Sequence, residues 1–185
     1  MGLAGRSGTS LTTAPPFTLP NPATGASVSL DAVRGTAATV VLFICEHCPY
    51  VVSVRDAIAA LAVDYAPRGV SVVLISSNDA ADYPADGPDA IAAAKGRYYP
   101  AAAAYLYDES QEVAKSYGAV CTPDCFIFAG PDLTAVYRGR IDASTPGNVV
   151  KPDGGYLRAA LDALLDDRAI PDAVPSMGCS IKWKN

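Results

Sequence analysis

Hydrophobic and polar positions change period several times along the chain, and each change predicts an element. Thr39–Ile44 is a continuous apolar and β-branched run, which predicts a strand buried on both faces. From Pro49 the apolar residues recur at three- and four-residue spacing up to Tyr65, so we expect a helix that Pro67 ends. Val70–Ile75 predicts a second buried strand.

Weaker patterns predict the remaining elements. Two hairpins are expected, one of residues 17–19 with 26–30 and one of residues 126–128 with 133–137. Residues 105–107 read as a short strand, and helices are expected over 89–98, 109–117 and 154–167. Residues 82–88 are rich in turn formers. This order predicts an α/β fold, with a central mixed sheet flanked by helices, an N-terminal hairpin and a C-terminal tail.

Composition restricts the class of protein. The chain has 185 residues, 50% of them hydrophobic and 18% charged, which is typical of one globular domain, expected at residues 15–185 after a flexible arm at 1–14. Its formal net charge of −5 argues against binding nucleic acid or an anionic membrane surface. The arm lacks the apolar core of a secretory signal, so we expect a cytoplasmic protein, or an organelle-matrix protein in a eukaryote. No cofactor and a monomer or weak homodimer are expected.

Five cysteines are the candidate chemistry of this chain, at positions 45, 48, 121, 125 and 179. An odd number without a signal peptide favours redox catalysis or metal binding over a secreted disulfide scaffold. Cys45 and Cys48 lie where the first buried strand gives way to a helix that Pro49 opens. Unpaired N–H groups at a helix start stabilise a thiolate, so we expect Cys45 to be exposed with a lowered pKa and Cys48 to be shielded behind it.

The residues between the two cysteines tune this pair. His47 is the chain's one histidine, and it is either a solvated loop residue or a group that stabilises the thiolate and makes the couple more oxidising. Glu46 acts against it by placing a negative charge beside Cys45. An intermediate redox couple is expected from these opposing charges.

The chain resembles the thioredoxin superfamily, specifically its peroxiredoxin-like redoxin branch of alkyl hydroperoxide reductase and thiol-specific antioxidant type. The resemblance rests on segments that cover nearly everything after residue 15: FICEHCPYVV (43–52), VVLISSND (72–79), YLYDESQEVAKSYGAVCTPDCFIF (105–128), VYRGRID (136–142) and PSMGCSIKWK (175–184). It implies a thioredoxin-like fold, with Cys45 as the attacking thiol and Cys48 as the resolving one. It also implies a cis Thr122–Pro123 bond beside the pair, with the Thr122 backbone free to pair with an extended substrate.

Two departures from the family pattern affect the expected chemistry. The buried aspartate that thioredoxins carry six residues before the first cysteine is Thr39 here, so a proton relay must come from Glu46, His47 or water. Peroxiredoxins carry Thr or Ser three residues before the peroxidatic cysteine, where this chain has Leu42 or Cys45. Efficient peroxidase activity is therefore not expected. Arg138 is expected on an exposed hairpin as a solvated charge.

The other cysteines receive separate expectations. Cys121 is either a loop residue or, by the resemblance, a neighbour of the dithiol at the surface. Cys125 opens an apolar strand and is expected to be buried and inert. Cys179 follows Pro171 and Pro175, and the apolar Ile181 and Trp183 should dock the tail, bringing Cys179 near Cys121 or Cys45 as a third redox partner.

Three functions compete at this level. The leading one is a thiol–disulfide oxidoreductase that acts on protein or small-molecule disulfides and thiols, with an unidentified electron donor. The alternative is a thiol peroxidase that works through a cysteine sulfenic acid. The third is a zinc-binding structural module, with Cys45, Cys48, Cys121 and Cys125 as paired knuckles.

Overall fold

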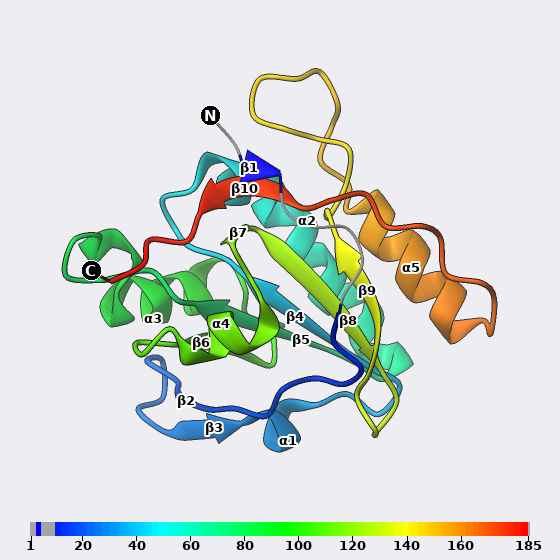
Figure 1. Ribbon diagram of the computed structural model, residues 1–185, viewed down its shortest axis with the longest axis horizontal. Coiled ribbons are helices and arrows are strands. Elements are labelled where there is room, and N and C mark those ends of the chain that lie inside the picture. Colours follow the sequence, from blue (N-terminus) through cyan, green and yellow to red (C-terminus); the bar gives the residue numbers. More distant parts are fainter. Residues whose placement is uncertain (1–2, 5–9, 185) are drawn as a thin grey trace.

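The computed structural model describes residues 3–4 and 10–184, and its centre is a five-stranded mixed sheet (Figure 1). The strand order is β6-β5-β4-β8-β9. Strands β4, β5 and β6 run parallel, whereas β8 and β9 are antiparallel additions beside β4. Their bounds are Ala38–Phe43 (β4), Val70–Ser76 (β5), Ala104–Tyr107 (β6), Asp124–Ala129 (β8) and Thr134–Gly139 (β9). The expected mixed sheet is confirmed.

Strand β4 is buried along its whole length, which explains its unbroken apolar sequence. Alternate side chains enter two separate cores: Val40 and Leu42 pack in one, Val41 and Phe43 in the other. The first core is completed by helices α2 (Pro49–Tyr65), α3 (Pro88–Arg97) and α5 (Gly155–Leu165). The second is completed by α4 (Glu112–Tyr117) and the N-terminal hairpin. The sheet is therefore covered on both faces.

The N-terminal hairpin forms as predicted. Strands β2 (Thr18–Pro20) and β3 (Ser27–Ser29) pair antiparallel, and the short helix α1 (Leu30–Val33) follows. After α2, a single 3₁₀ turn, η1 (Ala66–Arg68), contains Pro67, so the α-helix stops where the sequence predicts. Helix α4 begins three residues later than expected, because the carboxylate of Asp108 accepts the backbone N–H of Ala114 at 2.9 Å and holds residues 109–111 in a turn.

A second, three-stranded sheet is the part of the fold that the sequence did not predict. Its order is β1-β10-β7, with bounds Leu3–Ala4, Met177–Ser180 and Cys121–Thr122. Strand β10 belongs to the expected tail and crosses the molecule at the N-terminal end of α2 (red in Figure 1). The sequence of β10, MGCS, has neither the alternation nor the β-branched residues of a typical strand.

Parts of the expected N-terminal arm lie outside the described residues. Within the described part, Leu3–Ala4 pairs with β10, the N–H of Ala14 donates to the Leu133 carbonyl at 3.0 Å, and the Thr12 carbonyl accepts from Ala135 at 2.9 Å. Residues 12–14 thus follow the edge of strand β9. None of the helices described is both long and apolar enough to cross a membrane.

Candidate active site

The two cysteines of the C-x-x-C motif lie between the end of β4 and the start of α2. Cys48 is the N-cap residue of α2, with extended backbone angles (φ −69°, ψ 121°), and Pro49 occupies the first turn, where its missing N–H costs nothing. Cys45 is 1% exposed and Cys48 is fully buried, so the prediction that Cys45 is exposed is wrong. Each thiol shifts the pKa of the other, so the two cysteines are close enough to interact electrostatically. This proximity is consistent with a dithiol/disulfide couple.

Thr122 connects this pair to the loop before β8. The Thr122–Pro123 peptide bond is cis, as the resemblance implied. The Cys48 thiol donates to the Thr122 carbonyl at 3.1 Å, and the Thr122 hydroxyl lies 3.4 Å from Cys45 Sγ. One residue therefore contacts both sulfurs.

The charge distribution around the pair reverses the expected order of acidity. The pKa of Cys45 is raised, first because its thiol is hydrogen-bonded to Cys48, then by burial and by the negative charge of Asp86. The pKa of Cys48 is lowered to about 4, chiefly by the hydrogen bond from Cys45, which outweighs burial, with further lowering from Thr122 and Cys179. These shifts favour a thiolate on Cys48 over one on Cys45, whose pKa is raised and not lowered as expected.

Asp86 is the acidic residue at this site that sequence reasoning missed. It ends the short 3₁₀ helix η2 (Pro84–Asp86) and is fully buried. Its carboxylate accepts the backbone N–H groups of Glu46 at 2.8 Å and His47 at 3.2 Å, and the side-chain amide of Asn78 at 2.8 Å. The sequence held one usable signal: residues 82–88 follow β5, whose carboxyl end meets that of its parallel neighbour β4.

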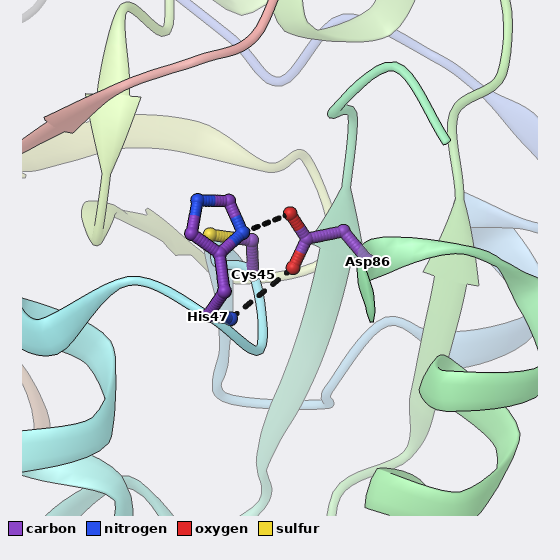
Figure 2. A group of neighbouring side chains, drawn as sticks. All are labelled: Cys45, His47 and Asp86. Atoms are coloured by element: carbon purple, nitrogen blue, oxygen red, sulfur yellow. Dashed lines mark hydrogen bonds and ion pairs between the residues drawn. The ribbon is translucent and has the colours of Figure 1, made fainter. Parts of the chain in front are cut away.

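His47 is held by Asp86 at the mouth of the site. Its Nδ1 hydrogen-bonds the carboxylate of Asp86 (Figure 2). Its ring stacks on Tyr83, with ring centroids 5.5 Å apart. The side chain is 32% exposed, so one face of the imidazole reaches solvent. His47 therefore links solvent to a buried carboxylate, which does not match the solvated-loop interpretation.

Glu46 has a different role from the one expected. Its carboxylate accepts the hydroxyl of Tyr105 at 3.0 Å and pairs with Arg55 at 3.2 Å. Burial raises the pKa of this carboxyl, and the hydrogen bonds from its two partners act against that rise. The negative charge that acts on Cys45 comes from Asp86.

The site also contains a candidate metal-ligand set. Within the described residues, one ligand atom each of Cys45, His47 and Asp86 lies within 4.8 Å of the others. Sulfur, nitrogen and oxygen ligands of this kind are those that Zn²⁺ accepts. The carboxylate of Asp86 already accepts four hydrogen bonds, so its hydrogen-bonding capacity is filled and it holds the surrounding groups in place. The structure does not favour the alternative of a four-cysteine zinc module, because Cys125 is paired within the central sheet opposite Leu42.

The structure separates the other predicted residues by burial. Cys121 is fully buried, not at the surface, and burial followed by the charge of Asp124 raises its pKa to about 12. Cys125 is buried, and burial raises its pKa well above the ordinary value, as expected of an inert cysteine. Arg138 is not a solvated charge: it is buried and pairs with Asp124 at 2.7 Å.

The tail places Cys179 at the dithiol. Cys179 lies opposite Thr122 in the β10–β7 register, and the Thr122 carbonyl accepts the Cys48 thiol at 3.1 Å. The tail was predicted to bring Cys179 near Cys121 or Cys45; the structure places it next to Thr122, where it acts on the pKa of Cys48. Of the two apolar residues expected to hold it, Ile181 is buried but Trp183 remains 40% exposed. The Thr122 backbone is paired with this tail, so it is not free for a substrate strand as expected.

The family model of the AhpC/TSA family matches residues 11–139. That span includes the C-x-x-C motif, Asp86 and the cis-proline loop. The chain belongs to the AhpC/TSA family. No curated protein matches it.

Solved structures place this AhpC/TSA protein among thioredoxin-like folds. An uncharacterized conserved protein from Geobacillus kaustophilus is 47% identical, with a TM-score of 0.91 and coverage of 100% of this chain and 97% of that one. A hypothetical protein from Sinorhizobium meliloti 1021 is 41% identical, with a TM-score of 0.91 and 98% of each chain covered. A putative thiol:disulfide interchange protein from Chlorobium tepidum is 20% identical, with a TM-score of 0.62 over 87% of this chain and 99% of that one, and shares the fold. Family and fold together support a redox function for this AhpC/TSA protein.

Proposed function

We propose that this protein is a thiol–disulfide oxidoreductase in which Cys45 and Cys48 alternate between dithiol and disulfide. The observation that carries the proposal is that both thiols contact Thr122, next to the cis proline: Cys45 Sγ lies 3.4 Å from its hydroxyl and Cys48 Sγ 3.1 Å from its carbonyl oxygen. Membership of the AhpC/TSA family and the thioredoxin-like fold support the same chemistry. Disulfides and thiols of proteins or small molecules are the substrate class, with a thiol electron donor.

Cys48 is the attacking thiolate in this proposal, and Cys45 is the resolving thiol. The Cys48 thiolate attacks one sulfur of a substrate disulfide, the substrate S–S bond breaks, and the other substrate sulfur leaves as a thiolate. Cys45 then loses its proton and attacks Cys48, which releases the second substrate thiolate and closes the Cys45–Cys48 disulfide. The lowered pKa of Cys48 supports the first step, because a lower pKa makes the nucleophilic thiolate more accessible.

His47 and Asp86 supply the proton acceptor for Cys45. Cys45 keeps its proton in the resting dithiol, since burial and the charge of Asp86 raise its pKa. One ligand atom of each of the three residues lies within 4.8 Å of the others, so a proton needs to move only a short way. Asp86 holds the ring of His47 in place and so acts as a positioning residue. This pair takes the part of the relay that Thr39 cannot provide.

Trapping of the mixed disulfide tests the assignment. Cys45→Ser/Cys179→Ser lacks both thiols that lie beside Cys48, and after treatment with oxidised glutathione it is expected to accumulate a mixed disulfide between Cys48 and glutathione, whereas Cys48→Ser/Cys179→Ser is not. Mass spectrometry of the intact variants after acid quenching gives the amounts. Accumulation on Cys45 in Cys48→Ser/Cys179→Ser alone would reverse the two roles, and wild-type protein that forms no Cys45–Cys48 disulfide would overturn the function.

A thiol peroxidase is a second candidate, and one contact favours it. The Thr122 hydroxyl, 3.4 Å from Cys45 Sγ, places a hydrogen-bonding group beside the pair although the sequence lacks the usual Thr or Ser three residues earlier. Cys48 thiolate would attack the peroxide, giving a sulfenic acid and an alcohol or water, and Cys45 would condense with it, releasing water. Peroxide consumption by wild type and Thr122→Val, compared with glutathione-disulfide turnover, separates this activity from the first.

A further inference from the structure

The C-terminal strand β10 brings a third thiol into contact with the buried pair. Cys179 lies opposite Thr122 in the antiparallel register, and the carbonyl of Thr122 accepts the Cys48 thiol at 3.1 Å, so Cys179 and Cys48 meet at the same residue. Cys179 is close enough to Cys48 to act on its pKa. Cys45 and Cys48 are sealed from solvent, whereas Cys179 is half-buried. Of these three thiols, Cys179 is therefore the one that an external partner can reach without opening the site.

We propose that Cys179 is a third redox residue that transfers the disulfide from the buried pair to the protein surface. The inference rests on the proposed function, because it requires a Cys45–Cys48 disulfide. Cys179 thiolate attacks Cys48, the Cys45–Cys48 bond breaks, and Cys45 leaves as a thiolate that takes up a proton equivalent to the one Cys179 lost. The exchange consumes no oxidant or reductant. An external thiol then attacks Cys179 and releases Cys48, and a second external thiol restores the Cys179 thiol and forms the external disulfide.

Lys182 acts on the Cys179 thiol. In the reduced protein, burial and the neighbouring Cys48 raise the pKa of Cys179 to about 11, while the ammonium of Lys182 acts to lower it. Lys182 therefore favours the thiolate form of Cys179, which the exchange requires.

Gly178 determines how closely the tail approaches the pair. A Cβ atom at this position would lie 1.9 Å from the carbonyl oxygen of Thr122 and 2.5 Å from its carbon, so any side chain here displaces β10. Beyond Cys179, the strand is anchored where the N–H of Ile181 donates to the Val120 carbonyl at 3.1 Å and that of Lys182 to the Asn78 side chain at 2.8 Å. The tail is therefore fixed on both sides of the thiol.

The position of β10 also explains why a surface thiol is needed. β10 occupies the backbone edge of Cys121–Thr122, where an extended substrate would otherwise pair. A substrate strand would have to displace the tail before it could reach Cys48. Exchange through Cys179 leaves the tail in place.

Disulfide mapping in Cys45→Ser tests the contact directly. After oxidation with diamide, this variant is expected to form a Cys48–Cys179 disulfide, because those are the two sulfurs left in contact. Wild type under the same conditions is expected to contain Cys45–Cys48. Free Cys179 in oxidised Cys45→Ser overturns the relay while a wild-type Cys45–Cys48 disulfide leaves the proposed function standing. Absence of the Cys45–Cys48 disulfide in wild type overturns both.

A glycine pair provides the matched control. In the Cys45→Ser background, Gly178→Ala should slow formation of the Cys48–Cys179 disulfide at least about tenfold, because disulfide geometry tolerates little displacement. Gly96→Ala, where a Cβ meets nothing within 4 Å, should leave the rate unchanged. Equal rates of Cys48–Cys179 disulfide formation in the two variants would contradict a relay that depends on the close packing of Gly178 against Thr122.

Turnover gives the second readout. Oxidised Cys179→Ser is expected to be reduced by glutathione at least about tenfold more slowly than wild type, since attack must then occur on a buried disulfide. Ser180→Ala, the next position on the same strand, should be reduced at the wild-type rate. A Cys179→Ser rate equal to that of wild type would overturn the relay.

Discussion

At the scale of single residues, which of the two cysteines carries the thiolate depends on their contact with each other and on the buried carboxylate of Asp86. Contact with Cys48, burial and the charge of Asp86 raise the pKa of Cys45, whereas contact with Cys45 is the largest cause that lowers the pKa of Cys48, so we expect the thiolate on Cys48. Thiolate absorbance against pH should therefore show a step near pH 4 in reduced wild type and in Cys45→Ser, which keeps a hydroxyl donor. The pH of this absorbance step should be higher in Cys45→Ala, and the step should be absent in Cys48→Ser. A low step that survives in Cys48→Ser would assign the thiolate to Cys45.

Asp86 gives a prediction with a definite sign. Asp86→Asn removes the negative charge that raises the pKa of Cys45, so the reduced dithiol ionises more readily and the couple becomes more oxidising. The amide also turns an N–H₂ toward backbone donors, which should cost about 1–3 kcal/mol of stability. Glutathione equilibration and urea denaturation measure the two effects. Asp82→Asn, an exposed neighbour in the same loop, should change neither.

His47 should move the couple in the opposite direction. An imidazole next to the pair can carry a proton and favour the reduced, ionised form, so His47→Ala should make the couple more reducing. The same glutathione equilibration decides this, with Tyr83→Leu as a control for the lost ring stacking alone. If the reduction potential of His47→Ala equals that of wild type, the imidazole ring has no electrostatic effect on the dithiol.

The sequence located most of these residues but not their relations. The motif and the return of the tail were predicted from spacing and chain-breaking residues, and the cis bond at Pro123 from the family resemblance. The raised pKa of Cys45 was not predicted, because it depends on contact with Cys48, on burial and on Asp86, which lies 38 positions beyond Cys48 in the numbering. A through-space charge of this kind leaves no periodic signal.

At the scale of elements, the long apolar runs predicted the central sheet and its helices, whereas the tail strand could not be predicted. Strands β4 and β5 carry their own signal, since burial on both faces requires apolar residues at every position. Strand β10 is a strand because Gly178 fits against Thr122 and because β7 and β1 offer backbone partners on either side. Such a strand is defined by its neighbours and not by its own sequence.

The start of α5 provides a test at this scale. The buried carboxylate of Asp142 accepts N–H groups from Ser144 at 2.8 Å, Asp153 at 3.0 Å and Gly154 at 2.9 Å, and so ties both ends of the loop before the helix. Burial acts to raise the pKa of this carboxyl, but the hydrogen bonds outweigh it and hold the pKa below its ordinary value. Its stabilisation is therefore complete above the unfolded pKa and is lost as the pH falls through the folded one.

Asp142→Asn should accordingly be less stable than wild type by about 1–3 kcal/mol at neutral pH, with the difference narrowing in acid. Urea denaturation at several pH values gives the comparison. The exposed Asp172→Asn is the matched control and should follow wild type throughout. A penalty for Asp142→Asn that stays constant down to the acid limit would show that the charge of Asp142 contributes nothing.

At the scale of the whole molecule, the redox state of the pair should set how stability depends on pH. In the dithiol, the folded protein has released the Cys48 proton above about pH 4, whereas the unfolded chain keeps it until about pH 8.5. Between these values the unfolded state binds more protons, so stability rises with pH, by up to about 1.4 kcal/mol per unit for one proton. Above that window the raised pKa of Cys45 reverses the trend, because the unfolded chain then releases a proton that the folded protein keeps.

The disulfide form has no ionisable group at either position, so this dependence should disappear on oxidation. Urea denaturation of reduced and oxidised wild type from about pH 5 to about pH 8 is the measurement, and the free energy of unfolding should rise with pH more steeply for the reduced protein. Reduced Cys48→Ser should lose the extra slope, whereas reduced Cys45→Ser should retain it. Parallel curves for reduced and oxidised wild type would mean that folding does not stabilise the Cys48 thiolate, and the attacking role of Cys48 would lose its electrostatic basis.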